Sequence, residues 1–223
     1  MTTNHLLTPC QHGFLNGRSC TTNLLAVLDA WTDAMDRGVP VDAIYLDFAK
    51  AFDTVPHQRL LTKLWGYGIR SKVQGWVEQF LVGRRQRVSV NGTKSPWSAV
   101  SSGIPQGSVL GPVLFVIFIN DLPDVTHSMA QMFADDTKVF REMNSEVDRD
   151  VLQEDLNMLT DWADRWQLRF NAGKCKVLHV GRSNPNYEYS MASGLNRVEL
   201  ETTVLEKDLG INIDPELKFS RHI

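Results

Sequence analysis

The sequence predicts an α+β fold in which an antiparallel sheet packs on helices. Helical and strand-type stretches are mixed along the 223 residues without a strict strand–helix–strand repeat. An Asn-Gly pair in RVSVNGTKSPW (87–97) is the turn expected of a tight antiparallel hairpin. Because 43% of the residues are hydrophobic, the chain is able to bury a substantial core as one or two domains.

The first part of the chain alternates helical and strand-type patterns. Residues 20–38 are expected to form a helix, because apolar side chains recur on one helical face: Leu24, Leu28, Trp31 and Met35. A short apolar run, VDAIYLDF (41–48), has the pattern of a strand and ends in an acid, Asp47. Pro56 suits the first turn of the next helix, and the apolar residues of 73–81 predict another.

The middle of the chain contains an apolar helix between a loop and a hairpin. Gly and Pro mark SSGIPQGSVLGP (101–112) as a loop, which leads into the apolar run VLGPVLFVIFI (109–119). This run is too short to span a bilayer, so it predicts a buried helix, and no membrane partner is expected. MFADDTKVF (132–140) places adjacent acids between two short apolar runs, which is the pattern of a hairpin.

A long helix followed by strands and loops is predicted for the last third. Apolar residues from Val151 to Trp166 recur at helical spacing. CKVLHV (175–180) alternates like a strand, whereas SNPNYEYSMASGLNR (183–197) has the composition of a loop. LEKDLGINID (205–214) has the pattern of a turn that leads into a strand.

The charge and cysteine content limit the classes of function. A net charge of −3 gives no global attraction for nucleic acid, so any such binding must rest on local patches. The clearest patch is GRRQR (83–87). A looser basic stretch lies further on: Arg165, Arg169, Lys174, Lys176 and Arg182. Three cysteines without a CxxC pair argue against a disulfide framework or a zinc site.

The adjacent acids Asp135 and Asp136 allow two interpretations. One is a solvated turn with Asp at its tip, which turn composition favours for an isolated pair. The other is half of a divalent-metal site, which requires a third acid, and the strand-terminal Asp47 is the candidate. If the two strands are neighbours in one sheet, three carboxylates converge, and such oxygen ligands suit Mg²⁺ or Mn²⁺. The spacing alone leaves both interpretations open.

Several motifs in order resemble the successive signatures of reverse transcriptases. The central ones are YLDFAKAFDTVPH (45–57), SSGIPQGSVLGPVLFVIFINDLP (101–123) and FADD (133–136). QHGFLNGRSC (11–20) and FNAGKCKVLHVGR (170–182) resemble the flanking motifs, and LGINID resembles the primer-grip turn. The particular residues in these motifs are similar to those of the jockey-like group of non-LTR (LINE) retrotransposons, and the resemblance runs over nearly the whole chain.

The resemblance implies a right-hand polymerase palm with partial fingers, with the thumb absent. Residues 1–43 and 55–103 would form the partial fingers, 44–54 and 104–216 the palm, and 217–223 the start of a missing thumb connection. The chain is expected to be truncated at both ends relative to the family. Fingers residues upstream of QHGF, a thumb and an endonuclease domain are therefore not expected.

The resemblance also implies an RNA-directed DNA polymerase that adds dNTPs to a primer 3′-OH, with an RNA template and a DNA primer as partners. Asp47, Asp135 and Asp136 would be catalytic and would hold Mg²⁺, with Mn²⁺ possible as the ion. The backbone carbonyl of Phe48 would be a further metal ligand. Lys174 matches the catalytic lysine that approaches the leaving pyrophosphate, with Lys176 as the near alternative.

The resemblance implies that further residues bind the incoming nucleotide or nucleic acid. Phe52 matches an aromatic steric gate that excludes a ribose 2′-OH, and an ordinary core Phe is a compatible interpretation. Gln106 and Gly107 match a loop that contacts template and incoming nucleotide. Arg18 is the one nearby candidate for holding the triphosphate. Residues expected at nucleic acid are the following: Arg84, Arg85, Arg87, Leu209 and Gly210.

Two other functions remain as alternatives. A catalytically inactive retrotransposon remnant, which at most binds nucleic acid, is one of them. An RNA-templated RNA polymerase with a similar palm is the other, and the aromatic Phe52 argues against it. The resemblance alone implies action in the nucleus rather than the cytoplasm, and no pattern indicates an oligomeric state.

Overall fold

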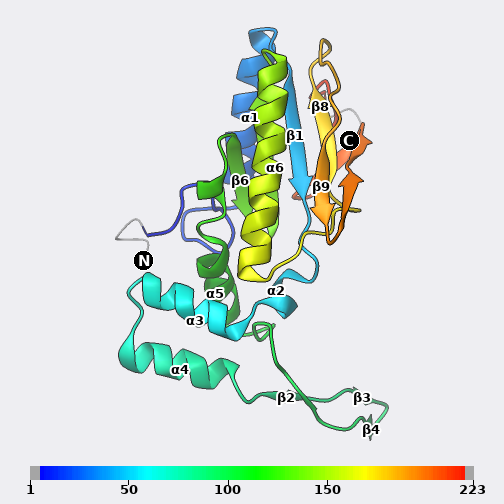
Figure 1. Cartoon of the computed structure of the whole chain (residues 1–223). Helices are drawn as coiled ribbons and strands as arrows, with labels where there is room; N and C mark the ends of the chain where they lie inside the picture. The colour runs from blue at the N-terminus through cyan, green and yellow to red at the C-terminus, as the bar shows by residue number, and fades with distance from the viewer. Residues whose placement is uncertain (1–5, 219–223) are drawn as a thin grey trace.

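A five-stranded sheet forms the centre of the computed structural model, which describes residues 6–218 (Figure 1). The strand order is β11-β8-β1-β7-β6. The strands span the following residues: β1 Val41–Leu46, β6 Met129–Phe133, β7 Asp136–Glu142, β8 Lys176–Val180 and β11 Glu201–Thr203. Strand β1 pairs antiparallel with both β7 and β8, so the two strand-type runs predicted to carry the acids are neighbours.

The sheet is mixed, which corrects the expectation of an antiparallel sheet. Strand β11 pairs with β8 in parallel, with Glu201 opposite Lys176 and Thr203 opposite Leu178. The stretch before β11 corrects a second expectation, because residues 183–197 are not a loop throughout. They contain the hairpin β9 (Ser190–Ser193) and β10 (Asn196–Glu199). Pattern and composition miss both features, because strands of three or four residues carry too little periodicity to reveal their partners.

Helices cover both faces of the sheet. Helix α1 (Cys20–Asp36) packs on one face and α6 (Glu146–Trp166) on the other. Successive strand residues point to opposite faces, so Val41 and Ala43 join the cluster around α1, whereas Ile44 joins the cluster around α6. Because both faces are covered, β1 is apolar and buried along nearly its whole length.

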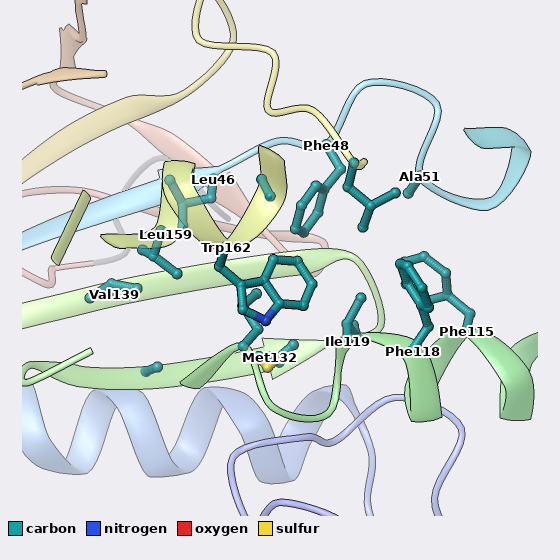
Figure 2. Packing of buried hydrophobic residues seen from close by; sticks show 14 of the residues in the cluster. Leu46, Phe48, Ala51, Phe115, Phe118, Ile119, Met132, Val139, Leu159 and Trp162 are labelled. Atoms are coloured by element: carbon teal, nitrogen blue, oxygen red, sulfur yellow. The ribbon is translucent and has the colours of Figure 1, made fainter. Parts of the chain in front are cut away.

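A second group of helices packs below the sheet: α2 (Ala51–Thr54), α3 (His57–Gly66), α4 (Ser71–Leu81) and α5 (Leu110–Ile119). The predicted apolar helix is α5, and it is buried along most of its length. Figure 2 shows Trp162 of α6 beside Met132 of β6 and Ile119 of α5. A short 3₁₀ turn, η2 (Pro123–Val125), then leads from α5 to β6.

Lys63 joins three of these helices from within the core. Its Nζ lies 3.9 Å from the Trp166 ring centroid and 4.6 Å from that of Trp162, and it donates to the Phe118 carbonyl and to Asp121. Burial lowers the pKa of Lys63 to about 8, although Asp121 opposes this change. The contacts tie α3 to α5 and α6.

An arm projects away from the helices (Figure 1). It consists of two short antiparallel pairs: β2 (Arg85–Gln86) with β5 (Ser98–Ala99), and β3 (Ser89–Val90) with β4 (Thr93–Lys94). At its tip, Asn91 and Gly92 have φ of 48° and 83°, which is the turn that the Asn-Gly pair predicts. All four strands are exposed along their length.

A two-stranded hairpin, β12 (Glu206–Asp208) and β13 (Ile211–Ile213), ends the described chain. Leu209 and Gly210 form its two-residue turn, with φ of 47° and 93°. Of the segment predicted to start a thumb connection, residues 219–223 lie outside the described residues. No helix within 6–218 is both long and apolar enough to cross a membrane.

Candidate active site

The register of β1 and β7 brings the predicted acids together. Leu46 pairs with Thr137, so Asp47 leaves β1 beside the residue with which β7 begins, Asp136. On the other side of the turn, Phe133 pairs with Asp136, which leaves Ala134 and Asp135 as the two loop residues. The strand-terminal acid and the hairpin acids therefore lie at the same end of two adjacent strands.

The backbone around Asp47 is fixed from the side opposite the hairpin. Its carbonyl accepts a hydrogen bond from the Asn171 amide at 2.7 Å, and its own amide donates to Cys175 Sγ at 3.4 Å. Cys175 is fully buried, and burial raises the pKa of its thiol to about 11. Two backbone hydrogen bonds join residues 47–49 to residues 169–171. They use the Asp47 carbonyl and the Ala49 amide, and the Phe48 carbonyl takes part in neither.

The pKa values of Asp135 and Asp136 lie above the ordinary carboxyl value. Burial raises the pKa of Asp135, and the nearby Asp47 carboxylate raises it further. Burial also raises the pKa of Asp136, as do Asp135 and Asp208, whereas Lys138 lowers it. Within the described part of the chain, no ion pair involves Asp47, Asp135 or Asp136. Such unneutralised carboxylates have the donor chemistry of a divalent-cation site.

The carboxylates do not form a closed metal site by themselves. Across residues 6–218, no group of three His, Cys, Asp or Glu side chains is already arranged to hold an ion. A hollow of about 130 Å³ lies beside the acids and is lined by both Asp47 and Asp136. Its other lining residues include Lys174, Asp208 and Leu209. The acids thus border an open hollow, where further ligands have space to complete a metal's coordination.

Phe52 and Gln106 lie on two segments that are bonded together. Phe52, on α2, stacks on Phe115 of α5 with ring centroids 4.2 Å apart, and its carbonyl accepts from the Ile104 amide. Gln106 Nε2 donates to Asp53 Oδ1 at 2.8 Å. A Cβ at Gly103 would lie 2.6 Å from the Asp53 carbonyl oxygen, so the loop reaches α2 only with glycine there. Asp53 was not among the residues predicted to function.

The three arginines lie at and near the base of the arm. Arg84 lines a hollow of about 500 Å³ together with Gln106. Arg87 lies over the Trp97 ring at 4.4 Å from its centroid, and Arg85 lies at 5.9 Å. Trp97 is half exposed, and no role for it follows from the predicted hairpin alone. The signal available in the sequence was an aromatic residue within a segment rich in arginine.

The remaining predicted residues separate into two groups. Lys174 and Leu209 line the hollow beside the acids, whereas Lys176 lies 3.7 Å from Glu206 in an ion pair. Arg18 is exposed and donates to the Pro9 carbonyl at 2.9 Å, away from the lining of that hollow. Gly107 and Gly210 both have positive φ, of 77° and 93°, so glycine suits each position.

Comparison with known proteins identifies the class to which this fold and site belong. Residues 1–208 match the family model described as reverse transcriptase (RNA-dependent DNA polymerase). The chain therefore belongs to the reverse transcriptase family. The resemblance found in the sequence motifs is confirmed.

Within this family, the chain is similar to polymerases of non-LTR retrotransposons. It is 34% identical to the RNA-directed DNA polymerase from mobile element jockey of Drosophila melanogaster, over 96% of this chain and 24% of that protein. It is 31% identical to the probable polymerase from transposon X-element of the same species, over the same shares. The chain spans about a quarter of the length of these relatives.

Solved structures agree with the fold. Apo telomerase from Candida tropicalis, truncated from its C-terminal domain, matches with a TM-score of 0.62 at 11% identity. The match covers 95% of this chain and 40% of the telomerase chain. Telomerase from Candida albicans, solved with a fragment of telomeric RNA, matches with a TM-score of 0.58 at 10% identity. At this identity the likeness concerns the fold alone.

Proposed function

We propose that this chain is the polymerase centre of an RNA-directed DNA polymerase that extends a primer 3′-OH with dNTPs on an RNA template. The observation that carries the proposal is the meeting of Asp47 with Asp135 and Asp136 at the adjoining ends of β1 and β7. Burial and repulsion from neighbouring carboxylates raise the pKa values of Asp135 and Asp136. Divalent cations relieve such repulsion, and Mg²⁺ or Mn²⁺ fits these oxygen donors.

In this proposal, bound cations would lower the pKa of the primer hydroxyl and stabilise charge on the leaving pyrophosphate. Asp47, Asp135 and Asp136 would hold the ions, and the Phe48 carbonyl would be a further ligand. The bonds from Asn171 and Cys175 keep the backbone at Asp47 in place before substrate binds. A carboxylate positioned in advance needs little rearrangement in the reaction step.

The nucleotide would lie between the acids and the joined segments of α2 and the 103–107 loop. Phe52 is held by its stack on Phe115, so its ring is a rigid obstacle to a ribose 2′-OH. Gln106 and Gly107 contact the template and the incoming base. Lys174 neutralises the pyrophosphate, because it lines the hollow beside the acids while Lys176 is paired with Glu206.

Nucleic acid would contact the chain on two sides. Leu209 and Gly210 lie at the turn of the hairpin beside the acids, where the primer end is proposed to rest. Arg84, Arg85 and Arg87 would follow the template phosphates along the arm. The exposed Trp97 ring beside two arginines supports this role, since unpaired bases stack on such a ring.

Primer extension on poly(rA)/oligo(dT) tests the proposal. The wild-type chain is expected to add dTMP with Mg²⁺ or Mn²⁺, and the Asp135→Asn, Asp136→Asn double variant to lose at least about 10²-fold in rate. The Asp161→Asn, Asp164→Asn variant, which removes two exposed charges from α6, is the matched control and should retain the wild-type rate. A wild-type chain that extends no more primer than the first variant would favour an inactive remnant. Extension with UTP in place of dTTP would favour an RNA polymerase.

A further inference from the structure

Residues 10–12 extend the sheet at its outer edge, next to the hairpin that carries the acids. The Met132 amide donates to the Cys10 carbonyl at 2.9 Å, and the His12 amide donates to the Met132 carbonyl at 2.8 Å. Gln11 thus forms a parallel bridge with Met132 of β6, the edge strand. This bridge brings the Gln11 side chain to the end of β6, where the chain turns toward Asp135.

Both polar ends of the Gln11 carboxamide bind backbone groups at this turn. Gln11 Oε1 accepts from the Ala134 amide at 2.8 Å and from the Gly13 amide at 2.7 Å. Gln11 Nε2 donates to the Ala134 carbonyl oxygen at 3.4 Å. The side chain is 1% exposed, so these bonds form without competition from water. One residue therefore satisfies both backbone groups of Ala134.

The turn needs such support because its geometry is unfavourable for alanine. Ala134 has a φ of 55°, which lies in the left-handed region that is unfavourable for an L-residue and that glycine normally occupies. Gly13 packs directly against this turn, since a Cβ at that position would lie 2.3 Å from the Ala134 amide nitrogen. A strained turn persists only where the surrounding structure determines it closely.

We propose that Gln11 is a positioning residue for the catalytic acids. The Ala134 carbonyl belongs to the peptide plane that ends at the Asp135 nitrogen and Cα, so the Nε2 bond fixes the orientation from which Asp135 departs. The inference rests on the proposed function of Asp135 and Asp136. It adds that the 11–13 segment acts on the reaction through the turn, without contact with substrate.

The chain contains a matched control for this arrangement. Gln153 on α6 binds both backbone groups of Ser190 in the same way. Its Nε2 donates to the Ser190 carbonyl at 2.8 Å, and its Oε1 accepts from the Ser190 amide at 3.0 Å. Ser190 begins β9 and does not line the hollow beside the acids. Gln153→Met therefore removes a similar pair of bonds at a distance from the site.

The test compares Gln11→Met with Gln153→Met in the full chain. Gln11→Met is expected to lower the single-turnover rate of dTMP addition by about 10²-fold, with the Kd for primer–template unchanged within about twofold. Hydrogen exchange at the Ala134 amide should become faster. Gln153→Met should lose comparable thermal stability and retain the wild-type rate. If Gln11→Met does not fold, Gln11→Glu, which retains the acceptor oxygen and the volume, replaces it with the same expected loss of rate.

Two results would overturn the proposal. One is a folded Gln11 variant with the wild-type rate, and the other is an equal loss of rate in Gln153→Met, which would assign the effect to stability alone. A wild-type chain that extends no primer would contradict the proposed function. Exchange at the Ala134 amide would then decide the role of Gln11, because unchanged exchange in Gln11→Met would show that the turn does not depend on it.

Discussion

Lys138 and Asp208 form an ion pair that is almost completely withdrawn from solvent, with side chains 2% and 3% exposed. Lys138 lies on β7, two residues after Asp136, and Asp208 ends β12. Lys138 Nζ also donates to Asn23 Oδ1 at 3.0 Å. The pair therefore joins the strand that begins with Asp136 to the hairpin whose turn is proposed to meet the primer.

Removing one partner of this ion pair should destabilise the chain more than replacing both partners with apolar residues. Lys138→Met leaves the Asp208 carboxylate buried without its cation, and a loss of about 3–5 kcal/mol in the free energy of unfolding is expected. The double variant Lys138→Met, Asp208→Leu should recover most of this loss. Urea denaturation of the single and double variants measures the coupling. Losses that simply add would contradict the pairing.

The acids predict a specific dependence of stability on pH. Asp135 and Asp136 have a pKa above the ordinary carboxyl value of 3.8, so between these values the folded chain binds more protons than the unfolded chain. Their contribution to the free energy of unfolding therefore falls as pH rises through this window. In metal-free buffer, the Tm of the double variant Asp135→Asn, Asp136→Asn should rise relative to that of wild type as the pH rises. The difference in Tm should increase by about 2–4 °C between about pH 4 and about pH 8. A constant difference in Tm would show that these carboxyl groups are not perturbed.

Because of Lys63, the free energy of unfolding is expected to rise, rather than fall, with pH in a higher pH range. Its pKa of about 8 lies below the ordinary 10.5, so the unfolded chain binds more protons between these values. The free energy of unfolding of wild type should therefore rise relative to Lys63→Met from pH 8 to 10.5, by at most about 3 kcal/mol. Chemical denaturation across this range measures the difference. A flat difference would mean that Lys63 titrates normally in the fold.

Phe52→Val should relax sugar selectivity. Removing the ring opens the space that a ribose 2′-OH would occupy, so the ratio of dTTP to UTP incorporation should fall by about tenfold or more. The ring also stacks on Phe115, so some stability is lost as well. Phe80→Val is a control, because Phe80 stacks on the exposed Trp76 of α4 and should leave the ratio unchanged. An active Phe52 variant with unchanged selectivity would remove the gate role.

Periodicity and turn chemistry predicted the elements that surround the acids. Four apolar repeats over α1, the Asn-Gly turn of the arm and the apolar run of α5 are all strong local signals. That β1 and β7 are adjacent strands was only a condition of the metal-site interpretation and was not predicted from the sequence. Alternating burial shows which residues of a strand point inward but does not show which strand lies beside it.

The residues that sequence reasoning missed act through long-range backbone contacts. Gln11 lies more than 120 positions from Ala134, and Asp53 and Cys175 are bonded to residues far away along the chain. No local pattern records such a bond, because a buried Gln or Cys has the same sequence signature whether or not it holds a turn. The parallel pairing of β11 was missed because a strand of three residues carries too little periodicity to reveal its partner.

Mn²⁺ binding tests most directly whether the carboxylates of Asp47, Asp135 and Asp136 share divalent cations, as proposed. Free Mn²⁺, measured by electron paramagnetic resonance during titration of the chain with primer–template and a non-reactive dNTP analogue, gives the affinity. Asp47→Asn and Asp136→Asn should each weaken binding by about tenfold or more, although Asp47 follows β1 and Asp136 begins β7, while Asp161→Asn on α6 should not. Binding of Mn²⁺ with wild-type affinity in either of the first two variants would contradict the claim.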